Sequence, residues 1–231
     1  MQSLRNGYTA LVFGASGALG AAFVDALQAD ERCARVIGVA RQGEPAMDLR
    51  SEASIAACAG QLLPHGPFHL VVDATGALTI DGQGPEKRLD ELNSDALLRA
   101  LQINAVGPAL LLKHVAPLLA PGERVIWAKL SARVGSIEDN RKGGWYGYRA
   151  AKAALNQLLQ TSAIELARRR PGLVLAALQP GTVRSVLSRP FVGDAAMAPA
   201  ESARRLLAVL DGLPAQGRAH FVDHQGQAIP W

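Results

Sequence analysis

Cysteine is scarce in this chain of 231 residues, which contains only Cys33 and Cys58. Neither is spaced from other cysteines or histidines in the way that metal sites require, so we expect no metal. Two isolated thiols are typical of proteins that stay in a reducing compartment. We therefore expect a cytoplasmic protein without disulfides.

Long hydrophobic runs and clustered charges are also missing. No run of about 18 apolar residues indicates a membrane span, and the short apolar run near the N-terminus ends in glycines, unlike a signal peptide. The net charge of +4 comes from scattered basic residues, apart from Arg168–Arg170. We therefore expect neither nucleic acid nor a membrane as a partner.

The residues that are present favour one globular domain spanning 1–231, because 49% are hydrophobic and only 19% are charged. Short apolar runs predict buried strands at Tyr8–Phe13, Arg35–Ala40, Phe68–Ala74, Arg124–Ala128, Leu173–Leu178 and near His220–Val222. Helical patterns lie between them, at Ala21–Ala29, Ser51–Leu63, Leu89–Leu119, Tyr146–Arg170 and Ala200–Leu210. This alternation predicts an α/β fold: a single Rossmann-fold domain with a doubly wound parallel β-sheet and helices on both faces.

A glycine-rich turn follows the first predicted strand. It reads Gly14-Ala15-Ser16-Gly17-Ala18-Leu19-Gly20 and leads directly into a helix. In such a βαβ unit, glycines allow a tight turn, close approach of a pyrophosphate and close helix packing. The pyrophosphate then lies at the helix N-terminus, where backbone N–H groups are free. The turn therefore predicts dinucleotide binding, with Ser16, Ala18 and Leu19 among the contacts.

The end of the second predicted strand bears on which dinucleotide is bound. An acid there would accept a hydrogen bond from the ribose 2′-hydroxyl of NAD, but the strand ends in Ala40-Arg41. The guanidinium of Arg41 would instead match a 2′-phosphate. We therefore expect NADP(H) to be preferred, with NAD(H) possible. Asp48, followed by Leu49, either caps the next helix or hydrogen-bonds the adenine amino group.

Tyr148 and Lys152 lie one helical turn apart in the stretch Gly144–Asn156. At that spacing the phenol and the ammonium share a helix face. A nearby cation favours phenolate, so we expect Lys152 to lower the pKa of Tyr148 and make it a general acid/base.

In the preceding helix, Pro108 has no N–H to offer the carbonyl of Asn104, and a kink there could hold an ordered water.

These motifs together resemble the short-chain dehydrogenase/reductase family over nearly the whole chain. Asp73-Ala74-Thr75-Gly76 resembles its Asn-Asn-Ala-Gly stretch, and Tyr148 to Lys152 its Tyr-x-x-x-Lys. Pro180-Gly181 resembles the Pro-Gly that follows the next strand. The stretches LSARVGSIEDN, GGWYGYRAAKAALN, PGTV and IPW are similar to the C-factor-like group and to sniffer-like carbonyl reductases.

The resemblance implies an oxidoreductase that moves a hydride between the nicotinamide of NADP(H) and a carbonyl or alcohol substrate. Tyr148 would be the acid/base, Lys152 would also bind the nicotinamide ribose, and Asn104 would hold a water through its main-chain carbonyl. A serine would bind the substrate oxygen, and we choose Ser131 over Ser136. Cofactor contacts would come from the glycine turn, Ala74, Thr75 and Gly76, Tyr148 and Lys152, and Pro180, Gly181, Thr182 and Val183.

Three positions depart from the family pattern. Ala18 stands where a glycine is usual and could weaken pyrophosphate binding. Asp73 replaces an asparagine and would bring a charge close to the cofactor. Ala132 stands where the catalytic serine is usual, which leaves three alternatives open: Ser131, Ser136 or no essential serine.

The resemblance also implies a homodimer or homotetramer built on the helices near 94–119 and 146–170. We expect pocket walls at 133–145 and 182–198, with 184–190 capping the site. A partly apolar substrate is indicated by Trp145, Tyr146, Leu187 and Phe191. The alternative is a nucleotide-binding signalling or regulatory protein on the same fold, because the C-factor group takes its name from a developmental signal.

Overall fold

A single parallel sheet organises the computed structural model, which describes residues 1–184 and 196–231. In this described part the strand order is β2-β1-β3-β4-β5-β6. The strands are β1 (Tyr8–Phe13), β2 (Cys33–Val39), β3 (Leu70–Asp73), β4 (Val125–Leu130), β5 (Leu173–Gln179) and β6 (His220–Asp223). The helices are α1 (Ala18–Gln28), α2 (Glu52–Leu62), α3 (Ser94–Leu101), α4 (Gly107–Val115), α5 (Tyr146–Ala167) and α6 (Pro199–Gly212).

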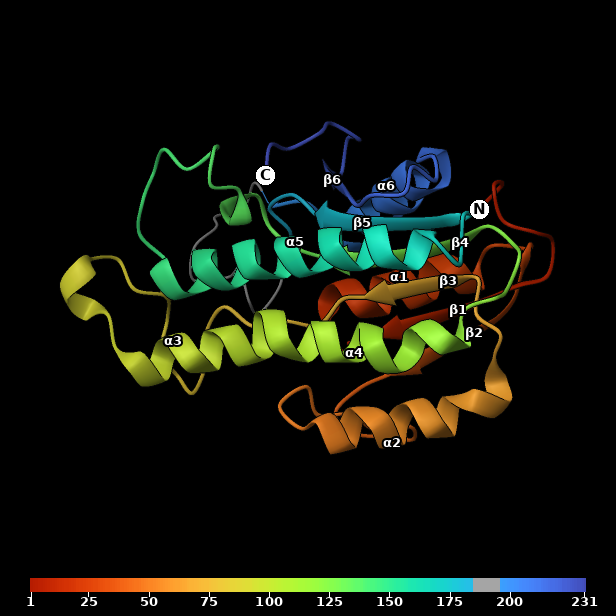
Figure 1. The fold of residues 1–231 in the computed structure, drawn as a ribbon, viewed down its shortest axis with the longest axis horizontal. Helices are drawn as coiled ribbons and strands as arrows, with labels where there is room; N and C mark the ends of the chain where they lie inside the picture. Colours follow the sequence, from red (N-terminus) through yellow and green to blue (C-terminus); the bar gives the residue numbers. More distant parts are fainter. Residues whose placement is uncertain (185–195) are drawn as a thin grey trace.

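Helices cover both faces of the sheet, as predicted (Figure 1). One hydrophobic core joins the sheet to α2, α4 and α5, and a second joins it to α1 and α6. Strand β1 serves both: Leu11 and Phe13 lie in the first core, and Ala10 and Val12 lie in the second. Side chains alternate between the faces of a strand, so a strand buried on both faces is continuously apolar.

The direction in which strands are added to the sheet reverses between β1 and β3. The chain runs outward from β1 to β2 and then returns past β1 to pair β3 on its other side. Ligands of open α/β sheets bind outside the carboxyl ends of the strands at such a reversal. The turns that follow Phe13 and Asp73 therefore face the predicted cofactor site.

The long helical region predicted at Leu89–Leu119 is divided. A π-helical turn, Gln102–Val106, separates α3 from α4, and the N–H of Gly107 donates to the carbonyl of Gln102. Pro108 cannot donate the usual helical bond to Asn104, which accounts for a break at this place. Wider π turns of this kind are frequent at functional sites.

By length and composition alone, the helical stretch Ser94–Leu118 would be long and apolar enough to cross a membrane. A core helix of a globular domain passes the same test. Here the stretch packs on α2 and α5, and α4 contributes Leu111, Leu112 and Val115 to the core.

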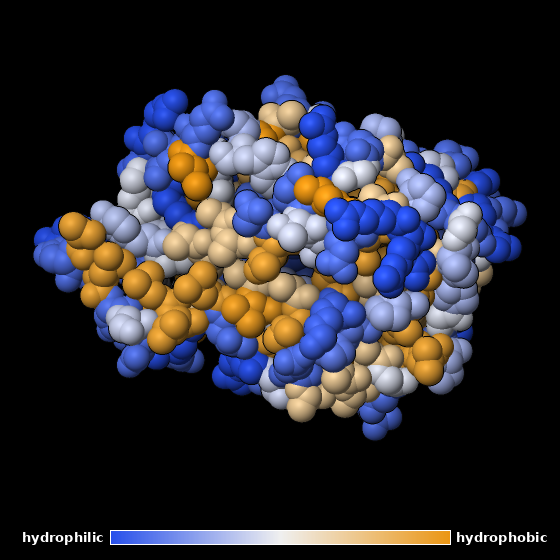
Figure 2. Space-filling view, in the orientation of Figure 1, coloured by the Kyte–Doolittle hydropathy of each residue, from blue (hydrophilic) through white to orange (hydrophobic). Residues whose placement is uncertain are grey.

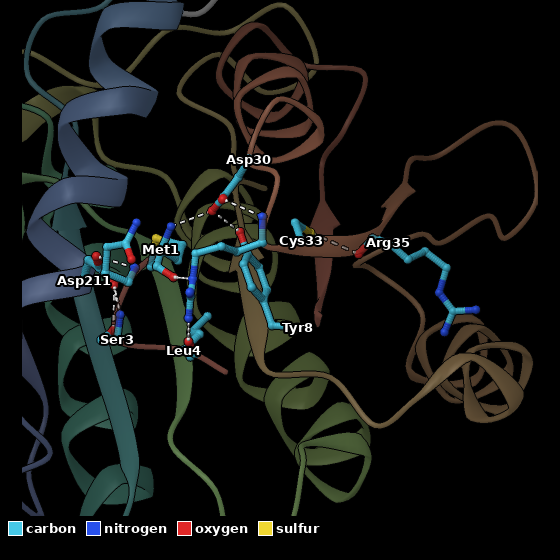
Figure 3. A network of polar contacts seen from close by, with 10 residues as sticks. Met1, Ser3, Leu4, Tyr8, Asp30, Cys33, Arg35 and Asp211 are labelled. Carbon is cyan, nitrogen blue, oxygen red and sulfur yellow. Dashed lines mark hydrogen bonds and ion pairs between the residues drawn. The ribbon is translucent and has the colours of Figure 1, made fainter. Parts of the chain in front are cut away.

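A polar network ties the first residues of the chain to the amino-end side of the sheet (Figure 3). The Met1 ammonium pairs with Asp30, whose carboxylate also accepts a hydrogen bond from the Tyr8 hydroxyl at 2.8 Å. On the other side, Ser3 donates to Asp211 of α6 through its hydroxyl at 2.6 Å and its N–H at 2.8 Å. Since Tyr8 begins β1, these contacts lie at the strand end opposite to the glycine turn.

Candidate active site

The glycine turn after β1 has the geometry of an anion site. Gly14 has a φ of +77°, and its N–H and that of Ala15 donate to the Val39 carbonyl at 2.9 and 3.0 Å. A Cβ on Gly20 would lie 2.0 Å from the Gly14 carbonyl oxygen, so that only glycine fits there. The N-cap of α1 is Gly17, which offers no side-chain acceptor, and the first turn holds no acid. Its N–H groups are thus available to a ligand.

The substitution at Ala18 does not crowd this turn. Ala18 is the first residue of α1 and is exposed, as are Ser16 and Gly17, while Leu19 is half-buried. A Cβ built on Gly17 would lie 3.3 Å from the Gly14 oxygen, a much milder contact than the one at Gly20. Because Ala18 is exposed at the start of α1, its methyl has room beside the turn.

Arg41 follows β2 and is exposed beside the glycine turn. Its guanidinium forms no ion pair within residues 1–184 and 196–231. Asp48 pairs with Arg50 at 2.8 Å, and this arginine, with a smaller contribution from Arg41, lowers the pKa of the Asp48 carboxyl.

The prediction that Asp48 caps the next helix is wrong. The N-cap of α2 is Ser51, whose hydroxyl accepts from the Ser54 N–H at 3.2 Å, because it immediately precedes the first turn. Contact of Asp48 with an adenine stays a prediction. Leu49, the other candidate contact, packs against the start of α4, where its carbonyl oxygen would lie 2.6 Å from a Cβ on Gly107.

The turn after β3 lies against the glycine turn and against α5. A Cβ on Gly14 would be 3.1 Å from the carbonyl of Ala74 and 3.2 Å from the nitrogen of Thr75. Gly76 has a φ of +140°, and a Cβ there would lie 3.0 Å from Oδ1 of Asn104 and 3.6 Å from Nζ of Lys152. The predicted residues after β1 and β3 and on α5 are thereby brought together.

Asn104, in the π turn, holds this region through its side chain. Its Oδ1 accepts from the Ala77 N–H at 3.0 Å, and its Nδ2 donates to the Ala77 carbonyl at 2.9 Å. A buried amide that satisfies both backbone groups of one residue fixes that residue firmly. This role of the side chain was not predicted, and the proposed role of the Asn104 carbonyl stays a prediction.

Asp73 does not bring an unbalanced charge to the site, as its sequence position suggested. Its carboxylate is fully buried and pairs with the equally buried ammonium of Lys129 at 2.9 Å. Lys129 also donates to the Thr75 carbonyl at 2.7 Å and the Thr75 hydroxyl at 3.0 Å. A buried charge is tolerated when it is paired and hydrogen-bonded. One feature of the sequence indicates the pair: each of two apolar runs ends in a charged residue, Asp73 in one and Lys129 in the other.

Tyr148 and Lys152 project from the first turns of α5. The Lys152 ammonium donates to the Leu130 carbonyl at 3.1 Å and lies 5.5 Å from the Tyr148 ring centroid. Burial, and then the charge of Lys129, lowers the pKa of Lys152 to about 7. Burial raises the pKa of Tyr148 to about 12.

The expectation that Lys152 lowers the pKa of Tyr148 is therefore wrong for the protein without a ligand. The reason is desolvation, which disfavours the charged form of both groups. Sequence spacing indicates which groups are neighbours, but it does not indicate how far they are removed from water.

The two candidate serines are both buried and both hydrogen-bonded elsewhere. Ser131 donates to Oδ1 of Asn156, on α5, at 2.7 Å. The Ser136 hydroxyl accepts from the Asp139 N–H at 3.0 Å and lies 3.4 Å from the carbonyl of Trp231. Among the described residues neither hydroxyl bonds to Tyr148, so the choice of Ser131 stays a prediction.

A loop far away in the sequence caps the start of α5. Trp145 precedes the helix with a φ of +56° and supplies no side-chain cap. The Glu86 carboxylate accepts from the Gly147 N–H at 3.0 Å, and the Glu86 carbonyl accepts from the Trp145 N–H. Sequence analysis missed Glu86, because nothing in the sequence relates it to a helix 60 residues later.

A cavity of about 260 Å³ lies beside Tyr148. Residues 77–86 and α3 form its walls, and Asn104 and Gly147 complete them. The walls that were predicted, 133–145 and 182–198, do not line this cavity in the described part of the chain. The predicted cap at 184–190, Leu187 and Phe191 lie almost entirely outside the described residues.

The segment after β5 also lies at the carboxyl edge of the sheet. The Pro180 carbonyl accepts from the Ser202 hydroxyl at 2.8 Å, and Gly181 has a φ of +82°. The main-chain carbonyl of Thr182 accepts from the Met197 N–H at 2.9 Å, and Val183 pairs with Met197 in an isolated parallel bridge. These contacts hold the four predicted cofactor residues in place beside β5.

Comparisons with known proteins agree with this architecture. The sequence model of the family described as Enoyl-(Acyl carrier protein) reductase matches residues 9–209. The C-signal of Myxococcus xanthus is 32% identical over 166 residues, which cover 72% of this chain and 94% of that protein. The 1-hydroxy-2-glutathionyl-2-methyl-3-butene dehydrogenase of Rhodococcus sp. (strain AD45) is 30% identical over 190 residues, covering 81% of this chain and 80% of the other.

A solved structure has the same fold over nearly the whole length. A Burkholderia multivorans protein, described as a short-chain dehydrogenase/reductase with bound NADP, superposes with a TM-score of 0.83 at 25% identity. The superposition covers 97% of this chain and 99% of the other.

Proposed function

The chain belongs to the short-chain dehydrogenase/reductase family of oxidoreductases, and on this premise we propose that it is an NADP(H)-dependent carbonyl reductase with Tyr148 as its general acid. The observation that carries the proposal is the position of Tyr148 and Lys152. Both start from α5 beside the turn after β3, and Lys152 is bonded to the end of β4. This is the edge of the sheet where α/β proteins bind nucleotides.

The residues at this edge fit a dinucleotide. The uncapped N-terminus of α1 suits a pyrophosphate, and the glycines at 14 and 20 leave room that a Cβ would fill. Arg41 is exposed beside the turn and suits a 2′-phosphate, which supports NADP(H) over NAD(H). The bound NADP of the Burkholderia multivorans structure supports the same choice.

When bound, the cofactor supplies the hydride. Tyr148 donates its phenol proton to the carbonyl oxygen of the substrate, where negative charge develops. With a pKa of about 12 in the protein without a ligand, Tyr148 keeps this proton near neutral pH, as a general acid must. Lys152 in its charged form stabilises the phenolate that remains and offers hydrogen bonds to the ribose hydroxyls. Ser131 is the proposed contact to the substrate oxygen, with Ser136 as the alternative.

The experiment has two arms. Thermal shift with NADPH and with NADH measures cofactor binding, because a ligand at about 100 times its Kd stabilises the native state by roughly 2.7 kcal/mol. Loss of NADPH absorbance with a panel of carbonyl compounds measures turnover, with Tyr148→Phe as the control. We expect a larger shift with NADPH and at least about a 100-fold loss of turnover in the variant. Equal turnover by Tyr148→Phe would contradict the proposal.

A second candidate function is nucleotide-dependent signalling or regulation, which the likeness to the C-signal of Myxococcus xanthus favours. On this alternative the protein binds NADPH but reduces none of the carbonyl compounds. The same two arms distinguish the candidates, since a thermal shift without turnover supports the signalling function.

We also propose a cytoplasmic homodimer or homotetramer that associates through α3, α4 and α5. Both cysteines are unpaired, as suits a reducing compartment. Large apolar side chains are exposed at Leu98, Val106, Leu158 and Ile164, and Figure 2 shows hydrophobic residues gathered along α3 and the neighbouring helices. Contiguous exposed apolar surface is typical of an interface. A monomer by light scattering at micromolar concentration would contradict this proposal.

A further inference from the structure

Two lysines and one carboxylate are buried together beneath the proposed site. Lys129 and Lys152 are 1% and 3% exposed, and Asp73 is 0% exposed. They approach the same turn, since Lys129 bonds to Thr75 and Lys152 lies against Gly76. Buried lysines are rare unless they are paired, so two of them beside one carboxylate form an unbalanced group.

One oxygen of the carboxylate is bonded to Lys129, and the other, Oδ2, is buried without a hydrogen-bond partner among the described residues. The Asp73 oxygen lies 2.9 Å from Nζ of Lys129, whose other acceptors are the carbonyl and hydroxyl of Thr75. An ammonium has three protons to donate, so Lys129 has one acceptor for each. Lys152 has one hydrogen bond in the described part of the chain, to the Leu130 carbonyl, and no ion pair.

Electrostatics distinguishes the two lysines. An adjacent carboxylate favours the charged form of an amine, whereas burial and a nearby cation disfavour it. In the described part of the chain, the titratable groups that face Lys152 are Asp73 from β3, Lys129 from β4 and Tyr148 from α5. Of these two charges, the like charge of Lys129 acts on the pKa of Lys152 more strongly than the opposite charge of Asp73 does.

We propose that Lys129 is a positioning residue of this site: it fixes the turn after β3 through Asp73 and Thr75, and it denies Lys152 a carboxylate partner, which makes Lys152 the lysine that exchanges its proton. The pKa of Lys152, about 7, supports this assignment. Burial also lowers the pKa of Lys129, but the contact with Asp73 opposes that effect. Because Asp73 holds the ammonium of Lys129, we expect Lys129 to keep its proton to higher pH than Lys152.

This assignment changes how the site responds to pH. A lysine with an ordinary pKa near 10.4 stays charged throughout the physiological range. Lys152 would instead change charge near neutrality, next to the phenol that it is proposed to support. This consequence for turnover rests on the oxidoreductase function proposed above, whereas the arrangement of the charges does not.

The test follows the protonation of each lysine directly. The chain has five lysines, Lys87, Lys113, Lys129, Lys142 and Lys152, few enough to resolve by NMR of protein labelled with ¹³C-lysine. The Cε shift is recorded against pH without cofactor or substrate, and Lys129 and Lys152 are assigned by replacing each with arginine. We expect Lys152 to titrate near pH 7 and before Lys129. The reverse order, or a Lys152 that stays charged to pH 9, overturns the proposal.

Variants test the cause of that order. Lys129→Gln releases Asp73, so we expect the affinity of Lys152 for its proton to rise at least tenfold. Lys129→Arg keeps the charge and should retain the titration of Lys152. An unchanged titration of Lys152 in folded Lys129→Gln overturns the proposal.

A double variant keeps the test decisive if Lys129→Gln does not fold. Asp73→Asn combined with Lys129→Gln removes both charges of the pair, so neither partner is left as an unpaired charge. Lys129 opposes the charge of Lys152 more strongly than Asp73 favours it, so Lys152 should titrate at higher pH in this double variant, by less than in Lys129→Gln. A wild-type titration in the double variant overturns the proposal.

Kinetics supply an independent arm. If the protein reduces carbonyl compounds with Lys152 charged, the alkaline limb of its kcat/KM profile should move with the Lys152 titration from variant to variant. If it reduces none, the function proposed above fails while the lysine titrations still decide the role of Lys129. The two proposals can therefore fail separately.

Discussion

Replacing Glu86 by alanine should loosen the start of the helix that carries Tyr148 and Lys152. α5 has no N-cap of its own, since Trp145 offers no side-chain acceptor and adopts the left-handed region. The Glu86 carboxylate supplies the missing acceptor to the Gly147 N–H at 3.0 Å. Its negative charge also lies where the helix dipole is positive.

The expected loss follows from these two contributions. Removing a side-chain N-cap costs about 0.5–2 kcal/mol, and removing a charge from a helix N-terminus costs about 0.3–1 kcal/mol. We therefore expect Glu86→Ala to lower the free energy of unfolding by about 1.5 kcal/mol. For a chain of 231 residues, this corresponds to a fall in Tm of roughly 3–6 °C.

Activity should fall further than stability implies. Tyr148 lies in the first turn of α5, and small displacements of a reacting group reduce rates strongly. We expect kcat to fall about tenfold, with a smaller change in KM. Glu86→Gln keeps an acceptor and loses only the charge, so it should restore most of the stability and the rate.

The matched control is Glu91→Ala in the same region. Glu91 is exposed and accepts from the Lys87 N–H at 2.7 Å, but among the described residues its side chain forms no hydrogen bond or ion pair with α5. Thermal denaturation, steady-state kinetics and amide hydrogen exchange at 146–149 would be measured for all three variants. The reasoning is refuted if Glu86→Ala behaves like Glu91→Ala in all three assays.

Three further experiments test the cofactor residues and the core. Arg41→Ala should weaken NADPH binding about 10-fold or more and leave NADH binding unchanged, because a charge-assisted bond is worth about 1.5–3 kcal/mol; fluorescence titration with both cofactors measures this, and equal losses would contradict it. Gly20→Ala should unfold the turn or abolish NADPH binding, because its Cβ would lie 2.0 Å from a backbone oxygen. In Gly17→Ala the Cβ would lie 3.3 Å from the same oxygen, so this variant should still bind NADPH. Calorimetric titration of both variants with NADPH measures the difference, and equal affinities would contradict it. Burial raises the pKa of the Cys58 thiol to about 11, so a thiol reagent at pH 8 should modify Cys58 only after denaturation, and rapid labelling of the native protein would show that its surroundings are open.

Much of the fold could be predicted because its strands are buried on both faces. Tyr8–Phe13 reads as a continuous apolar run ended by glycine, and β1 has those bounds. The alternation of such runs with helical patterns predicted the parallel sheet and both helical layers, which are confirmed. The family was predicted from Tyr148, Lys152 and the glycine turn, and the comparisons confirm it.

The site was less predictable, because its properties depend on contacts distant in sequence. Ser51 rather than Asp48 caps α2, a competition between two nearby acceptors that spacing does not decide. Ser131 is bonded to Asn156, 25 residues further along the chain. The direction of the pKa shift at Tyr148 was predicted wrongly, since burial acts on this phenol more strongly than its neighbour does.

Asp73 shows how such long-range contacts change the meaning of a single residue. In the sequence it is a departure that places a charge near the cofactor, but in the fold it is half of a pair with Lys129. Removing either partner leaves a buried charge alone, which typically costs about 3–5 kcal/mol, whereas replacing both by neutral residues can cost little. Asp73 and Lys129 are therefore expected to be exchangeable only together. An asparagine at 73 alone would leave the buried charge of Lys129 unpaired beside Lys152. The aspartate at 73 is therefore stabilised by a residue 56 positions later in the chain.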